Sequence, residues 1–345
     1  MSVSNLQIGL AIAGGLVLVA VVAHGAWTSR KMAPRQASVP VTDDDATDVL
    51  IEPRLDAQAF GVDAFTPPPS EKRAALDSLL DVIAPVGLDG EVSGEAALAA
   101  MPASRRAGSK PFAVEGLNNQ TRLWETPAPA RRYDAFQVGV QLANRTGALN
   151  DIEFSEFVVK AQAFCDAING TPDFPDMLEE VARARELDQF ASAHDAQLEF
   201  TLRARSAAWS PGYVQQHAAR LGFLPGVLPG RMVLPASVAG LPPVLGLSFD
   251  SQAALAEDPA QAAVREVSLA LDVPQVERSE RPFQRMREVA IGLAAAMDGT
   301  ITDDNGLMLP PDALDVIGSE LEKLYDALEQ RDMAVGSALA RRLFS

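Results

Sequence analysis

The carboxy-terminal third of the chain shows the most regular pattern of apolar and polar positions. Alternate apolar residues at 198–204 and 267–273 predict two strands with one buried face each. Shorter apolar runs at 231–234 and 244–249 predict two more strands. Apolar residues three and four apart predict amphipathic helices, since that spacing forms one stripe on a helix. These helices lie at 210–222, 283–297 and 314–328.

Between the last two helices, the run Asp303-Asp304-Asn305-Gly306 separates the apolar segments 300–302 and 307–309. Asn and Gly tolerate positive φ, so this run predicts a hairpin turn better than a metal-binding carboxylate pair. The resulting order, β-α-β-β-β-α-β-β-α, predicts an α+β fold with an antiparallel sheet and helices on one face. The open face would carry small or polar residues such as Thr201, Ser268 and Ala270.

The middle of the chain, residues 71–195, has a weaker pattern. Spacing predicts helices at 76–83, 154–168 and 175–190, and strands at 111–114 and 135–142. Cys165 falls on the apolar stripe of the second helix, which indicates a small buried hydrophobe and not a nucleophile. The role of this region stays open, and a divergent copy of the carboxy-terminal β-α unit is one interpretation.

The amino-terminal segment predicts a membrane anchor. No charged side chain occurs from residue 2 to residue 29, and the apolar run 6–26 is long enough to span a bilayer as a helix. A secretory signal peptide would carry positive charge before the run. Here Arg30, Lys31 and Arg35 follow it, so the positive-inside rule places the carboxy-terminal side in the cytoplasm.

After the anchor, the sequence becomes acidic and rich in Pro, with no persistent helical or strand period. Residues 30–70 are therefore predicted to form a flexible linker. The expected organisation is an anchor at 1–29, this linker, a middle α/β region at 71–195 and a carboxy-terminal domain at 196–345.

Composition excludes several classes of function. A net charge of −17 repels nucleic acid, and one Cys with three scattered His residues indicates no disulfide and no metal site. Phosphate-binding loops, nucleophile elbows and HExxH pairs are missing from the sequence, so neither an enzyme nor a cofactor is expected. A non-enzymatic interaction protein is the class that fits.

Several segments then resemble a known family, the bacterial cell-division ZipA proteins. Residues 24–31, HGAWTSRK, look like that family's juxtamembrane segment after an amino-terminal span. The series 271–274, 283–290 and 299–310 resembles its strand, helix and hairpin, and Leu221-Gly222-Phe223 resembles its helix end. The middle region departs from the long Pro- and Gln-rich linker of better-known members.

The resemblance implies an inner-membrane protein of the division site that tethers FtsZ by binding its carboxy-terminal tail on the open sheet face. The family's groove has a large aromatic residue about where Ala270 stands and an arginine about where Gly306 stands, so a shallower pocket is expected here. The expected tail-binding residues combine that face with apolar residues from neighbouring strands. They are Thr201, Arg203, Leu228, Met232, Ser248, Phe249, Ser268 and Ala270.

Two other classes remain as alternatives. The same architecture suits an adaptor for another cytoplasmic or envelope protein, and a membrane-anchored enzyme would need a polar pocket in the middle region. Self-association through the anchor stays open, because Gly9, Gly14 and Gly15 do not form a clean GxxxG pattern.

Overall fold

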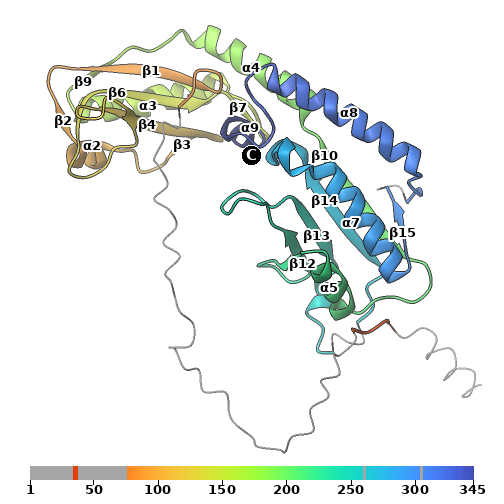
Figure 1. Cartoon of the computed structure of the whole chain (residues 1–345). Coiled ribbons are helices and arrows are strands. Elements are labelled where there is room, and N and C mark those ends of the chain that lie inside the picture. Colours follow the sequence, from red (N-terminus) through yellow and green to blue (C-terminus); the bar gives the residue numbers. More distant parts are fainter. Residues whose placement is uncertain (1–33, 38–75, 259–261, 304–305) are drawn as a thin grey trace, which may run out of the picture. The chain divides into compact units, whose positions relative to one another are not determined.

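The computed structural model describes residues 34–37, 76–258, 262–303 and 306–345, which form two compact units (Figure 1). Unit 1 contains residues 34–37 and the segment Ala196–Ala340. Unit 2 contains residues 76–195 and the last five residues, Arg341–Ser345. The chain therefore passes between the units three times, between residues 37 and 76, at 195/196 and at 340/341.

Unit 1 is built on a six-stranded antiparallel sheet in the order β11-β12-β13-β14-β10-β15. The strands are β10 (Gln197–Ala204), β11 (Leu224–Pro225), β12 (Arg231–Leu234), β13 (Leu245–Phe249), β14 (Glu266–Asp272) and β15 (Gly299–Thr302). The helices are α5 (Pro211–Arg220), α6 (Ser251–Ala254), α7 (Pro282–Met297), α8 (Pro311–Glu329) and α9 (Ala338–Leu343), and α9 runs on into unit 2.

One face of this sheet forms the core of unit 1. Phe200 and Leu202 of β10 are buried there, and the Phe200 ring packs edge-on against Phe283 of α7. Helix α5 begins where Ser210 caps it by accepting a hydrogen bond from the Tyr213 amide, with Pro211 in the first turn. The other face of the sheet carries the alternate, polar positions.

Unit 2 is built on a second antiparallel sheet whose main path is β3-β4-β6-β1-β9. These strands are β1 (Asp81–Leu88), β3 (Arg106–Ala107), β4 (Lys110–Asn118), β6 (Arg132–Gln141) and β9 (Gly170–Pro172). Short strands β2 (Val92–Ser93) and β5 (Trp124–Glu125) join its edges, and β7 (Ala143–Asn144) pairs with β8 (Gly147–Ala148). The helices are α2 (Gly94–Ala100), α3 (Asp151–Ala167) and α4 (Met177–His194).

The core of unit 2 lies between its sheet and α3. Phe112 of β4 and Phe136 of β6 pack against Phe157 and Phe164 of the helix, with ring centroids 6.1 Å and 5.5 Å apart. Asn150 and Glu153 close a capping box at the start of α3. Cys165 is fully buried on the same helix, as its place on the apolar stripe predicted.

The two units share one topology. In unit 2 the first strand, β1, lies between β6 and the short strand β9 that follows α3. In unit 1 the first strand, β10, lies between β14 and the short strand β15 that follows α7. The remaining strands extend both sheets in the same order, β6-β4-β3 and β14-β13-β12, and a further helix closes each unit.

Most predicted elements of unit 1 are confirmed, including β12 at its predicted bounds, and the α+β antiparallel class is confirmed. The short helix predicted at 76–83 is wrong, because residues 78–80 form a turn and β1 starts at Asp81. A leucine spacing of three and four is too short there to outweigh the β-branched run that follows. Helix α2, which the sequence analysis did not predict, follows a Ser93 cap.

Two findings differ from the expected domain bounds. Arg35, placed in the expected linker, forms a bridge with Trp209, and its backbone bonds Ala208 and Ser210 at 2.7 Å and 2.8 Å. The last five residues, expected in the carboxy-terminal domain, pack with unit 2. The predicted span 6–26 lies outside the described residues, and no described helix is long and apolar enough to cross a membrane.

Candidate functional site

The exposed face of the unit 1 sheet is brought together by the pairing of β10, β14 and β13. Ala270 of β14 lies opposite Glu199 on one side and Gly246 on the other. Ser268, two residues earlier and therefore on the same face, lies opposite Thr201 and Ser248. Four small residues from two neighbouring strands thus form one patch, called here the small-residue floor: Gly246, Ser248, Ser268 and Ala270.

This floor is open to solvent. Ala270 is exposed, while the other three residues of the floor are half-buried. A Cβ added to Gly246 would meet no atom within 4 Å, so nothing among the described residues lies over that position. A sheet face with small side chains and no covering layer leaves room for a partner's side chains.

Charged residues border the floor along β10. Arg203 Nε lies 3.4 Å from the Glu266 carboxylate across the β10–β14 pair, and both side chains are about half exposed. The Arg203 guanidinium also reaches the turn after β15, where Nη1 lies 3.1 Å from the place that a Cβ on Gly306 would take. Arg203 is therefore held at the edge of the floor, with part of its surface available to a ligand.

A cavity of about 620 Å³ opens at the end of this face, beside the first half of β10. Strand β15 pairs only with the part of β10 from Thr201 onwards, so no described strand pairs with residues 197–200 on that edge. The lining combines Ala270 of the floor, three carboxylates and several apolar residues. It consists of Gln197, Leu198, Glu199, Phe200, Ala270, Leu271, Asp272, Asp303, Leu309 and Ile317.

The predicted tail-binding residues divide into two groups. Five of them lie on the exposed face, as the alternation of their strands required: Thr201, Arg203, Ser248, Ser268 and Ala270. Leu228 is exposed in the turn between β11 and β12. Met232 and Phe249 do not lie on the exposed face, because they are 3 % and 8 % exposed and lie on the helix-packed face.

The register explains that correction and shows what the sequence analysis missed. Met232 pairs with Leu247, a core residue, whereas Val233 pairs with Gly246 of the floor. Val233 in turn pairs with Leu224 of β11, and Arg231 pairs with Ser248. Residues alternate between the two faces along β12 and β13. Once Leu247 is known to be buried, this alternation assigns Met232 to the helix-packed face and Val233 to the exposed face.

Comparison with known families gives one match. Residues 255–320 match the family described as ZipA, C-terminal FtsZ-binding domain. The matched segment contains β14, α7 and β15, and therefore two residues of the floor, Ser268 and Ala270. The resemblance to ZipA is confirmed. No curated protein matches the chain at a significant level.

The matched family is one of FtsZ-binding domains, so the similarity of residues 255–320 is to a protein-binding domain. The ZipA-type match lies wholly in unit 1, and unit 2 lies outside it.

Proposed function

We propose that the chain tethers FtsZ filaments to the cytoplasmic membrane, with the carboxy-terminal tail of FtsZ bound on the exposed sheet face of unit 1. The observation that carries the proposal is that two residues of the small-residue floor, Ser268 and Ala270, lie inside the matched ZipA segment. This floor is exposed, borders a cavity, and lies on the side of the sheet away from α7.

Binding would depend on apolar contact more than on charge. The floor offers close approach to an extended or helical segment, and Val233 and Leu224 add apolar surface beside it. Arg203 would contact an acidic residue of the tail, but an exposed ion pair contributes only ~0–1 kcal/mol. A buried apolar anchor contributes roughly 2 kcal/mol or more.

Arg203 lies near the place where the wider family is expected to carry an arginine that is missing here. Gly306 stands where the family's arginine was expected, and the Arg203 guanidinium lies next to that glycine. A positive charge is therefore supplied at about the same place from a neighbouring strand. The small side chain of Ala270 makes the pocket shallower, so the affinity should rest on the apolar residues around it.

The membrane part of the proposal rests on the sequence of residues 6–26 and on the basic residues after them. In this arrangement, the amino terminus is periplasmic and both units are cytoplasmic, where FtsZ polymerises. An adaptor for another cytoplasmic or envelope protein would use the same architecture with a different ligand on the floor.

The test is co-sedimentation of the full chain, in detergent micelles, with FtsZ filaments. We expect the chain to sediment with filaments of intact FtsZ and to stay in the supernatant when the FtsZ tail has been removed. Equal sedimentation with tailless filaments would contradict tail binding, and no sedimentation with either would favour the adaptor alternative.

A further inference from the structure

The shared topology allows the two sheets to be compared position by position. In unit 1 the first residue of β10, Gln197, pairs with the last residue of β14, Asp272. In unit 2 the first residue of β1, Asp81, pairs with the last residue of β6, Gln141. Two residues further along, Ala270 of the floor in unit 1 therefore corresponds to Gly139 in unit 2.

The face of unit 2 that corresponds to the exposed floor is not open. A Cβ on Gly139 would lie 2.5 Å from Cδ2 of Leu76, so the Leu76 side chain rests directly on this glycine. The Leu76 amide donates to Oε1 of the buried Glu115 at 3.1 Å. The other carboxylate oxygen of Glu115 accepts from Gln137 at 2.8 Å. A leucine of the chain itself thus lies over Gly139, whereas the corresponding Ala270 of unit 1 is exposed.

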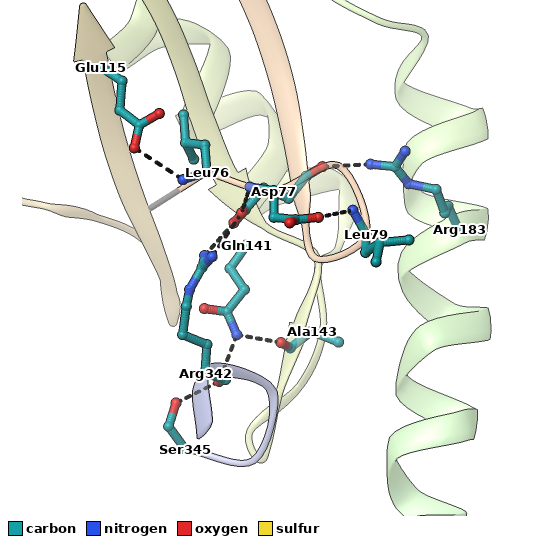
Figure 2. Close-up of polar contacts among 10 residues, drawn as sticks. Leu76, Asp77, Leu79, Glu115, Gln141, Ala143, Arg183, Arg342 and Ser345 are labelled. Atoms are coloured by element: carbon teal, nitrogen blue, oxygen red, sulfur yellow. Dashed lines mark hydrogen bonds and ion pairs between the residues drawn. The ribbon is translucent and has the colours of Figure 1, made fainter. Parts of the chain in front are cut away.

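The carboxy-terminal segment occupies the adjoining end of the same face (Figure 2). Arg342 of α9 binds both carboxylate oxygens of Asp81, with Nη1 to Oδ2 at 3.0 Å. The Asp81 side chain is 1 % exposed and that of Arg342 is 27 % exposed, so the buried carboxylate is met by a two-pronged guanidinium that is partly open to solvent. Gln141, which lies beside Asp81 in the sheet, donates to the backbone oxygen of Arg342 at 2.9 Å.

Contacts continue to the end of the chain. Leu343 and Phe344 are fully buried in unit 2, with exposed fractions of 0 % and 1 %. The Arg145 amide donates to the backbone oxygen of Ser345 at 3.3 Å, and the Ser345 hydroxyl donates to the oxygen of Arg342. The segment is therefore held by one charged side chain, two apolar side chains and backbone hydrogen bonds. Peptide-binding domains recognise short segments by the same kinds of contact.

We propose that unit 2 is an intramolecular peptide receptor whose ligand is the carboxy-terminal segment Arg341–Ser345 of the same chain. The sheet face that binds a partner in unit 1 is, in unit 2, used to hold this segment. The docked segment gives the chain its last passage between the units, at residues 340/341. Release of the segment from unit 2 would remove this connection. The part of this proposal that concerns unit 2 does not depend on FtsZ binding by unit 1.

The charge of the segment matters because Asp81 is buried. Burial raises the pKa of the Asp81 carboxyl, while the hydrogen bonds and charge of Arg342 lower it in part. An unpaired carboxylate at this depth is costly, and a guanidinium matches its two oxygens at once. The receptor should therefore select a peptide with arginine at this position over one with alanine.

The experiment supplies the segment in trans. A chain ending at Ala340 is titrated with a labelled peptide of residues 338–345, and the intact chain is titrated in parallel. We expect saturable binding to the shortened chain and at least tenfold weaker binding to the intact chain, whose own segment occupies the site. The Arg342→Ala peptide should bind at least tenfold more weakly, and the Ala338→Ser peptide, changed at an exposed position, within threefold of the parent.

If the shortened chain shows an intact unfolding transition but no peptide binding, or if it binds the Arg342→Ala peptide equally well, the proposal is wrong. If the shortened chain does not fold, amide hydrogen exchange on the intact chain decides. Arg342→Ala should then speed exchange at Arg145 and in the last residues, with Ala338→Ser, at an exposed position of α9, as control. Unchanged amide exchange at Arg145, or faster exchange across all of unit 2, would contradict the proposal that the segment docks as a peptide.

Discussion

Arg35 and Asp298 form an ion pair in which Nη2 of the guanidinium lies 2.8 Å from Oδ2 of the carboxylate. Arg35 also donates to the backbone oxygen of Met297 at 3.1 Å. Together with its backbone bonds to Ala208 and Ser210, this pair attaches residues 34–37 to unit 1. Only seven residues, 27–33, then separate the predicted span from the attached segment 34–37. They reach at most about 30 Å, so unit 1 should work close to the membrane surface.

Breaking this attachment should free the segment without unfolding unit 1. Arg35→Ala removes an ion pair that is about one third exposed, so we expect a loss of about 1 kcal/mol or less in unfolding free energy. Hydrogen exchange should quicken at the Ser210 amide, which donates to the Arg35 oxygen. Gln36→Ala, an exposed neighbour, is the control. Unchanged exchange at Ser210 in the Arg35 variant would show that the side chain does not hold the segment.

Two glycines on corresponding sheet faces should respond differently to the same substitution. At Gly139 a Cβ would lie 2.5 Å from Leu76 and 2.8 Å from the Val82 backbone oxygen, so Gly139→Ala should destabilise unit 2 by about 1–3 kcal/mol. At Gly246 the space is open, so Gly246→Ala should leave stability unchanged or raise it by up to ~1 kcal/mol. Urea unfolding of both variants and of the parent measures these changes in unfolding free energy. Equal losses would mean that the unit 2 face is not filled by Leu76.

The buried thiol of Cys165 should make the stability of the protein depend on pH in the alkaline range. Burial raises the pKa of the Cys165 thiol to about 11 from a usual value of 9.0. Between these values the native state holds a proton that the unfolded state has lost, so stability falls as pH rises from 9 to 11. We expect the unfolding free energy of Cys165→Ala to fall by ~1–2 kcal/mol less than that of the parent between pH 9 and pH 11. Unfolding measured at several pH values in this range gives the two slopes to compare. Parallel slopes in the two proteins would place the thiol in contact with solvent.

Strong local patterns predicted much of unit 1. The period-two run at β10 and the three-and-four spacing at α7 each extend over enough residues to determine the element and its buried face. Strand β12 has four residues with apolar side chains on both faces, so its face was not decided by its own sequence. That is why Met232 was named as an apolar contact from a neighbouring strand and Val233 was not.

Unit 2 and the chain ends were harder to predict because long-range contacts determine them. The turn before β1 is fixed by Asp81, which accepts from the Asp77 amide, and by Arg342, which lies 261 residues away in sequence. Arg35 likewise contacts residues more than 170 positions later. No local period encodes such pairs, so a linker and a single 196–345 domain were the natural expectations.

The membrane orientation can be tested by a fusion. A reporter enzyme that is active only outside the cytoplasm, fused after Ser345, should give no signal, because Arg30 and Lys31 follow the predicted span. The same reporter fused before Met1 should be active. A strong signal from the carboxy-terminal fusion would contradict both the orientation and access to cytoplasmic FtsZ.

Ala270 is the most informative position of the exposed small-residue floor of unit 1. Ala270→Asp places a charge in the middle of the floor, whereas Ala295→Asp places the same charge on an exposed position of α7, away from the floor. Neither residue is in the core, so the thermal midpoint should change little in either variant. Arg203→Ala removes a half-exposed charge at the edge and should weaken binding by ~0–1 kcal/mol.

The most direct measurement is titration of a labelled FtsZ carboxy-terminal tail peptide against the parent chain and these three variants. We predict a loss of roughly 2 kcal/mol in binding free energy for Ala270→Asp, less than half of that for Arg203→Ala, and no loss for Ala295→Asp. Unchanged affinity for Ala270→Asp, with the protein folded, would contradict tail binding on this face.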